Sequence, residues 1–189
     1  MKMRLFALAG MLLMFAGCAS TLVRETPRRV ALTPDVAVDM APVVEKLLDH
    51  PCSFVQAVSG AWKDHAVAGE FVVKNDGTNM TVVVLAPGMR LATIKAARPH
   101  RLQYERARQI PAAFEPEYLL LDLALVNLDD AELRKCLGPE VVVERVDGAR
   151  RLRVGERMIA TLSPRAEDGT QRFENHVRDY GYTLKDLEL

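Results

Sequence analysis

Residues 71–94 read FVVKNDGTNMTVVVLAPGMRLATI and contain the clearest evidence for the architecture of this chain. Two runs rich in β-branched residues flank Asn75-Asp76-Gly77, a composition typical of a tight hairpin turn. A second break at Ala86-Pro87-Gly88 precedes residues 89–94, where apolar and polar side chains roughly alternate, as on a half-buried strand. The segment therefore predicts three consecutive antiparallel strands.

The same pattern of strands and turns extends on both sides of this segment. It runs from Ser53 to about Arg106 and resumes after Glu140, where Asp147-Gly148 separates two further strands. Later strands are expected over residues 157–162, 172–180 and 182–187. The total is roughly ten short strands, which predicts an antiparallel sheet that needs a cover over one face.

Two helices are expected between the halves of the sheet. Pro116 suits the first turn of a helix, and residues 118–128 are apolar on nearly all sides. A second helix is expected to begin at Asp129 or Asp130 and to end at Gly138-Pro139. We therefore predict an α+β fold that is mainly antiparallel β: a curved half-barrel with a two-helix insertion acting as a lid.

The N-terminus has the pattern of a secretory signal peptide. Lys2 and Arg4 precede an apolar run from Leu5 to Ala16, which Gly17-Cys18 closes. The run is too short to cross a bilayer, which takes roughly 20 apolar residues. The expected organisation is a signal peptide over residues 1–17, a lipidated tether over 18–38 and a single half-barrel domain over 39–189, which begins with a short helix.

Phe15-Ala16-Gly17-Cys18 resembles the lipobox of bacterial lipoproteins. The resemblance implies cleavage before Cys18, diacylglycerol on its thiol and a further acyl chain on its amine. Two or more chains anchor a protein stably in a membrane. By analogy with the enterobacterial sorting system, Ala19 implies delivery by the lipoprotein-sorting machinery to the outer membrane, facing the periplasm.

The mature chain has a nearly balanced charge. Removal of Lys2 and Arg4 from the 25 basic residues leaves 23, against 25 acidic residues. This balance argues against nucleic acid as a partner, because phosphate binding needs a clear basic excess. Cys52 and Cys136 are either a disulfide pair in an oxidising compartment or two buried free thiols, and the sequence leaves both alternatives open.

Three short stretches carry a family resemblance: Arg90-Leu91-Ala92-Thr93-Ile94, residues 117–125 and Tyr180-Gly181-Tyr182-Thr183-Leu184. They resemble an uncharacterised family of bacterial lipoproteins, often encoded beside aryl-polyene and fatty-acid-like biosynthesis genes. After the second stretch the family tends to have Trp-Pro, where this chain has Asn127-Leu128. The family in turn looks like a distant relative of the Lol-pathway lipoprotein carrier and its outer-membrane receptor. That likeness implies an incomplete antiparallel barrel with a helical lid, which holds acyl chains.

Catalysis has little support in the sequence. The serines of the mature chain are Ser20, Ser53, Ser59 and Ser163. None of them lies in a Gly-x-Ser-x-Gly elbow. Asp64-His65 has no evident nucleophile beside it, and the four histidines are too far apart in sequence to suggest a metal site. No catalytic residues are known for the family, so we expect neither an enzyme nor a cofactor.

Asp122 is a lone acid in an apolar helix. Burying it unpaired would cost several kcal/mol, so we expect a hydrogen bond to a helix end or to an arginine, with a ligand-facing role as the alternative. Two arginine clusters present a choice between solvated strand faces and an anion site. Their members are Arg98, Arg101, Arg106 and Arg108, and then Arg145, Arg150, Arg151, Arg153 and Arg157.

Two functional hypotheses remain. In the first, the half-barrel binds or helps to transfer an acyl or glycolipid-type hydrophobic ligand. The expected lining residues are then Phe71, Val84, Met89, Leu91, Tyr118, Leu119 and Leu123. In the second, the interior is filled and the protein is a non-catalytic structural subunit of an envelope assembly. An apolar cavity of roughly 300 Å³ or more would favour the first hypothesis, and a tightly packed interior the second.

Overall fold

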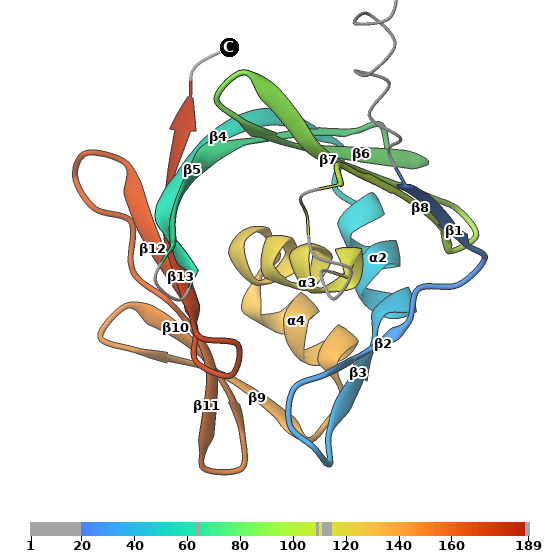
Figure 1. The fold of residues 1–189 in the computed structure, drawn as a ribbon. Coiled ribbons are helices and arrows are strands. Elements are labelled where there is room, and N and C mark those ends of the chain that lie inside the picture. The colour runs from blue at the N-terminus through green and yellow to red at the C-terminus, as the bar shows by residue number, and fades with distance from the viewer. Residues whose placement is uncertain (1–19, 63–64, 109, 111–114, 188–189) are drawn as a thin grey trace, which may run out of the picture.

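The structure is a computed structural model that describes residues 20–62, 65–108, 110 and 115–187. Within these ranges eleven strands form one antiparallel sheet, in the order β1-β8-β7-β6-β5-β4-β13-β12-β11-β10-β9. Figure 1 shows the sheet curving around three helices without closing, since β1 and β9 lie at its two edges. The predicted α+β half-barrel with a helical insertion is confirmed.

The sheet has two halves that are separated in sequence by the helices α3 and α4. The first half comprises β1 (Ser20–Arg24), β4 (Cys52–Trp62), β5 (His65–Asn75), β6 (Asn79–Ala86), β7 (Met89–Ala97) and β8 (Arg101–Arg106). The second half comprises β9 (Val141–Val146), β10 (Ala149–Val154), β11 (Arg157–Leu162), β12 (Thr170–Asn175) and β13 (Tyr180–Leu187).

The last strand, β13, joins the two halves. It pairs with β12 on one side and with β4 on the other, where Tyr182 lies opposite Gly60. A Cβ atom added at Gly60 would collide with the carbonyl oxygen of Gly181 and with the backbone of Tyr182. Glycine at position 60 therefore allows β13 to lie this close to β4.

The three helices begin where the local sequence satisfies their free N–H groups. Asp39 caps α2 (Met40–Leu48) by accepting from the N–H of Ala41 at 2.9 Å. Asp129 and Glu132 form a capping box at the start of α4 (Asp130–Leu137), and Pro116 occupies the first turn of α3 (Pro116–Asn127). The helices expected from the sequence are confirmed. No helix among the described residues is long and apolar enough to span a membrane.

The described part of residues 18–38 differs from the expected tether, because it belongs to the folded domain. β1 pairs with β8, and β2 (Arg29–Ala31) pairs with β3 (Ala37–Asp39) in a separate two-stranded sheet. Val30, Leu32 and Val38 are buried in the core. These strands are too short to produce a recognisable sequence period. Cys18 and the predicted signal peptide lie outside the described residues.

Cys52 and Cys136 are free thiols, so the disulfide alternative is wrong. Cys136 lies on α4, and its thiol donates to the carbonyl oxygen of Pro42 on α2 at 3.6 Å. Cys52 instead begins β4 and packs against the core while half-buried. Because the two residues have different partners, no bond joins them. Burial raises the pKa of both thiols.

Candidate ligand site around helix α3

Helix α3 lies inside the curve of the sheet (Figure 1), which explains why it is apolar on nearly all sides. All residues from Leu119 to Leu125 are buried. A helix on the surface would carry a polar stripe, but this part of α3 has no side that faces water. The helix is nevertheless attached to its surroundings by polar contacts near its start, at its middle and near its end.

Near its start, α3 is attached to the N-terminal segment. Glu117 is fully buried and forms an ion pair with Arg24, the last residue of β1. The backbone N–H of Arg28 donates to the same carboxylate at 3.0 Å, and the Arg28 guanidinium pairs with Glu115 at 3.1 Å. The last residue of β1 and the segment that follows it therefore position the first turn of α3.

At its middle, α3 is attached to β13 through Asp122. The carboxylate accepts hydrogen bonds from the hydroxyls of Tyr180 and Tyr182, the second at 3.5 Å. The side-chain amide of Asn175 on β12 donates to the Tyr180 hydroxyl at 3.2 Å. The expectation of a helix end or an arginine as the partner was wrong. The tyrosines come from a distant strand that only the tertiary fold brings to α3.

The electrostatics of this contact follow from its burial. Burial raises the pKa of Asp122 to about 7, although hydrogen bonds from Tyr180 and the charge of Arg178 act in the opposite direction. Burial also raises the pKa of Tyr180 and of Tyr182 well above the ordinary value. Near neutral pH the tyrosines therefore keep the protons that they donate, while Asp122 changes its ionisation.

Near its end, α3 is attached to β10 through Arg150, which is 7% exposed. The Arg150 guanidinium donates to the carbonyl oxygen of Leu125 and forms an ion pair with Asp130 at 2.7 Å. Asp130 also pairs with Arg145 at 2.7 Å. Arg150, which we placed in an arginine cluster, thus binds the free carbonyls of a helix end rather than a surface anion.

A cavity of about 10 Å³ lies between α3 and the sheet. Its volume is roughly that of a single water-sized probe, so α3 packs closely against this part of the sheet. Its lining is largely apolar, with Gln56 and Tyr182 as the residues that carry polar groups, and it comes from four strands and α3. The lining residues are Gln56, Phe71, Val82, Leu119, Leu123, Val126, Tyr182 and Leu184. The pocket that these described residues line is far smaller than the roughly 300 Å³ that would favour ligand binding most directly.

The structure places the predicted lining residues in two groups. Phe71, Leu119 and Leu123 line the cavity, and Val84 and Tyr118 pack half-buried against the same core. Met89 instead lies at the β6–β7 turn and is 48% exposed, with the half-buried Leu91 close by on β7. Sequence reasoning missed Gln56, Tyr182 and Leu184. Tyr182 and Leu184 belong to the stretch over residues 180–184 that carries part of the family resemblance, and this resemblance could have identified them.

The interior is less tightly closed at the end of the sheet that carries the β6–β7 turn. On β5, Val73 is buried and Phe71 is half-buried. On β6, Val82 is buried and Val84 is half-buried. On β13, Leu184 is buried and Tyr182 is half-buried. The half-buried member of each pair lies nearer to the β6–β7 turn.

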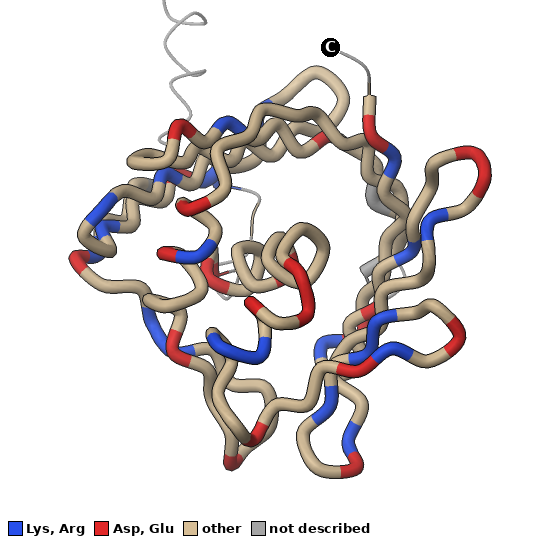
Figure 2. Tube along the Cα trace, turned by 180° about the vertical axis from the view of Figure 1, so that it is seen from behind, with Lys and Arg blue, Asp and Glu red and all other residues tan. Residues whose placement is uncertain are grey.

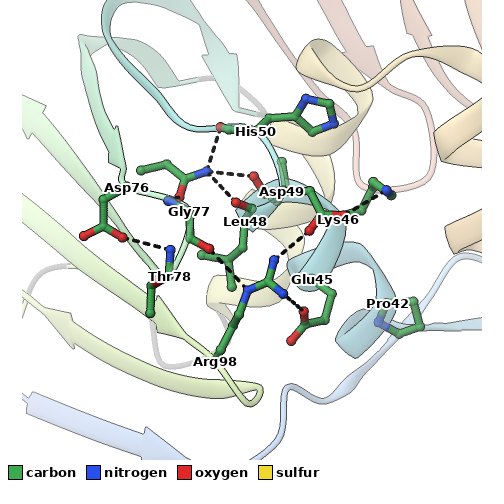
Figure 3. Close-up of polar contacts among 12 residues, drawn as sticks. Pro42, Glu45, Lys46, Leu48, Asp49, His50, Asp76, Gly77, Thr78 and Arg98 are labelled. Carbon is green, nitrogen blue, oxygen red and sulfur yellow. Dashed lines mark hydrogen bonds and ion pairs between the residues drawn. The ribbon is translucent and has the colours of Figure 1, made fainter.

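Polar contacts close the opposite end, which carries the β5–β6 turn (Figure 3). The side-chain amide of Asn75 donates to the carbonyl oxygen of His50 at 2.7 Å, just after α2. Arg98 in the β7–β8 turn forms ion pairs with Asp49 at 2.6 Å and with Glu45 at 3.1 Å. The hydrogen bonds with Lys46 and Arg98 lower the pKa of Asp49, so these pairs stay charged at neutral pH.

The other candidate residues form no further site. Acidic and basic residues are interspersed along the described trace (Figure 2), and arginines of the second cluster pair with nearby carboxylates, as Arg153 does with Glu144 at 3.5 Å. His176 bonds to the Thr161 hydroxyl at 2.9 Å, and the described residues hold no group of three metal-ligating side chains. A polar groove of about 570 Å³ along β4, β12 and β13 is lined in part by small residues, among them Ser59, Ala61 and Gly181.

Residues 53–188 match the family model described as a protein of unknown function (DUF3261). The chain belongs to the DUF3261 family. No curated protein and no solved structure matches the chain. The DUF3261 region contains α3, β13 and the Asp122–Tyr180 contact, whereas Arg24 and Arg28 come from the segment before it.

Proposed function

We propose that this DUF3261 protein is an outer-membrane lipoprotein, anchored through Cys18 and facing the periplasm, that binds or helps to transfer acyl or glycolipid-type ligands. The observation that carries the proposal is a mostly apolar helix that an open sheet encloses and that polar contacts attach to its surroundings at a few points. The distant resemblance to the Lol-pathway carrier and receptor agrees with it.

In this proposal α3 occupies the space that a ligand would take. A drug-sized or acyl ligand needs roughly 300 Å³ or more, which far exceeds the cavity beside α3, so binding requires α3 to move away from the sheet. An acyl chain would then replace the contacts of Leu119 and Leu123 with the sheet. Where the acyl chain contacts both α3 and the sheet, the apolar surfaces of both stay out of water, and the exchange then costs little hydrophobic free energy.

The contact near the start of α3 is suited to such movement. One carboxylate oxygen of Glu117 and the Nε of Arg24 have no hydrogen-bond partner among the described residues. A buried ion pair that is incompletely satisfied contributes less than its charges suggest. Release of this pair would give its charges new partners in water.

Titration with fatty acids of increasing chain length tests the proposal. The lipid-free mature chain is mixed with a fluorescent fatty acid, which is then displaced by unlabelled saturated fatty acids. Each buried methylene contributes about 0.8 kcal/mol, so we expect the dissociation constant to fall about fourfold per added methylene until the site is filled. A dissociation constant that is independent of chain length would contradict the proposal.

A matched pair of variants locates the site. Leu123→Trp enlarges a side chain that lines the cavity and should weaken fatty-acid binding. Val142→Trp places the same side chain at a position on β9 that is 46% exposed, and it should leave binding unchanged. Circular dichroism spectra and unfolding midpoints of both variants show whether each one is folded. Equal binding by the two folded variants would place the ligand elsewhere.

The packed interior supports a second candidate function, a structural subunit of an envelope assembly without a ligand cavity. On this view α3 is a permanent core helix, and its polar contacts serve only stability. The two candidates differ in one measurable property. A structural subunit binds no fatty acid at any chain length, whereas a carrier binds in a manner that depends on chain length.

A further inference from the structure

We infer that the β6–β7 end of the sheet is a docking surface for the lipid bilayer, so that the less tightly closed end of the interior faces the membrane. This inference rests on the lipid anchor at Cys18 in the proposed function. It adds an orientation and an interaction surface, which the anchor by itself does not specify. Strand register, the reach of the chain and the burial of the inner face support it.

Strand register places the start of the described chain at the β6–β7 end. Ser20 on β1 lies opposite Arg106 on β8, and Arg106 lies opposite Ala92 on β7. β1 and β7 both pair antiparallel with β8, so they run in the same direction and both begin on the side of the β6–β7 turn. The β6–β7 turn, residues 86–89, therefore lies on the side from which the chain enters the sheet.

The reach of the chain keeps this end close to the anchor. Ser20 follows Cys18 by two positions, so the two residues lie at most about 7 Å apart even when the chain is fully extended. Along β7, Met89 lies three residues beyond Ala92, or about 10 Å at the rise of a strand. Met89 thus projects at least as far in this direction as Cys18, the residue that carries the lipid. A membrane that holds the lipid would contact the turn as well.

The chemistry of the two ends of the sheet favours the same orientation. The β6–β7 turn presents Pro87, Gly88 and Met89, all exposed, followed by the exposed Arg90. An apolar residue beside a basic one suits the boundary between acyl chains and anionic headgroups. The β5–β6 end instead carries the ion pairs of Arg98, which insertion into lipid would have to desolvate.

The burial of side chains on the inner face of the sheet differs between its two ends, and this difference links the orientation to ligand binding. Phe71, Val84 and Tyr182 are half-buried on the anchor side, and Val73 and Val82 are buried on the far side. An acyl chain that leaves the bilayer at the β6–β7 end would meet the half-buried side chains first. It would reach the contacts of α3 without crossing the polar end of the sheet.

Fluorescence quenching on vesicles tests the orientation. The full lipidated chain, with Trp62→Phe as background, carries a single tryptophan as either Met89→Trp or Thr78→Trp and is bound to phosphatidylethanolamine–phosphatidylglycerol vesicles. Thr78 is an exposed residue of the β5–β6 turn and provides the matched control. With phospholipids brominated on their acyl chains, we expect Met89→Trp to lose more than half of its emission and Thr78→Trp less than a tenth.

Equal quenching at both positions, or stronger quenching at position 78, would overturn the orientation. Hydrogen exchange of the unsubstituted lipidated chain gives a second readout, in which vesicles should slow exchange at residues 86–90 and leave residues 76–79 unchanged. Failure of the chain to float with vesicles would overturn the anchor and the orientation together. Fatty-acid binding is measured separately, so flotation with unequal quenching but no binding would refute the carrier function alone.

Discussion

Replacement of Asp122 by asparagine should remove a loss of stability that sets in as the pH rises. The pKa of Asp122 is raised from 3.8 to about 7 in the folded chain, chiefly by burial. Between about pH 4 and pH 7 the folded chain therefore holds a proton that the unfolded chain has released. The free energy of unfolding therefore falls with increasing pH across this window. The stability that the proton on Asp122 contributes is fully present only below about pH 4.

The magnitude follows from the shift. Each unit of pKa corresponds to about 1.4 kcal/mol, so Asp122 costs the folded state up to about 4 kcal/mol once the pH exceeds 7. Asparagine does not titrate, and its carbonyl oxygen can still accept from the hydroxyls of Tyr180 and Tyr182. The stability difference between variant and wild type should thus increase in favour of the variant by about 4 kcal/mol from pH 4 to pH 8.

Urea unfolding of the lipid-free chain over this pH range, followed by circular dichroism, measures the difference. Asp168→Asn serves as a control, because hydrogen bonds from Thr170 lower the pKa of this exposed carboxylate. Its removal should not reproduce the effect in this window. A pH dependence of stability that is the same for Asp122→Asn as for wild type would refute the buried, protonated state of Asp122.

Three further substitutions test the attachment of α3 and the shape of the sheet. Glu117→Gln should cost about 3 kcal/mol in a urea unfolding experiment because it leaves the half-buried Arg24 with only the more distant Glu115, at 3.9 Å, as a charge partner, whereas Glu115→Gln, at a half-buried position, should cost under about 1 kcal/mol. Arg150→Ala should lower stability by about 3 kcal/mol, far more than Arg145→Ala at the exposed end of the same network; equal losses would contradict the role of Arg150 at the end of α3. Gly60→Ala should prevent β13 from pairing with β4 and unfold the chain, and a folded variant with an unchanged circular dichroism spectrum would contradict the close approach of these strands.

The local sequence predicted the elements of the fold well. Asn75-Asp76-Gly77 and Asp147-Gly148 both lie in turns between paired antiparallel strands. Asp39, Pro116 and Asp129 mark the starts of the three helices. These signals are local, since each depends on a turn or on N–H groups within a few residues. The pairing of β13 with β4 depends on distant residues, and no local signal reports it.

The candidate site was predictable only in part. Residues 118–128 are apolar on nearly all sides, which indicated a helix without a solvent face, and Phe71, Leu119 and Leu123 indeed meet at the cavity. The partners of Asp122 and Glu117 could not be predicted, because hydrogen bonds between residues so far apart in sequence leave no periodic pattern. Residues 20–38 were wrongly expected to be a tether for a similar reason, since their short strands gain stability from packing rather than from local propensity.

Hydrogen exchange at α3 in the presence of a bound fatty acid tests the central claim most directly. Residues 116–127 are enclosed in the free chain, so their amides should exchange slowly. We expect a saturating long-chain fatty acid to make these amides exchange faster, because the ligand displaces the helix, while the paired residues of β5 and β6 stay protected. Unchanged or slower exchange of α3 at saturation would contradict displacement of the helix.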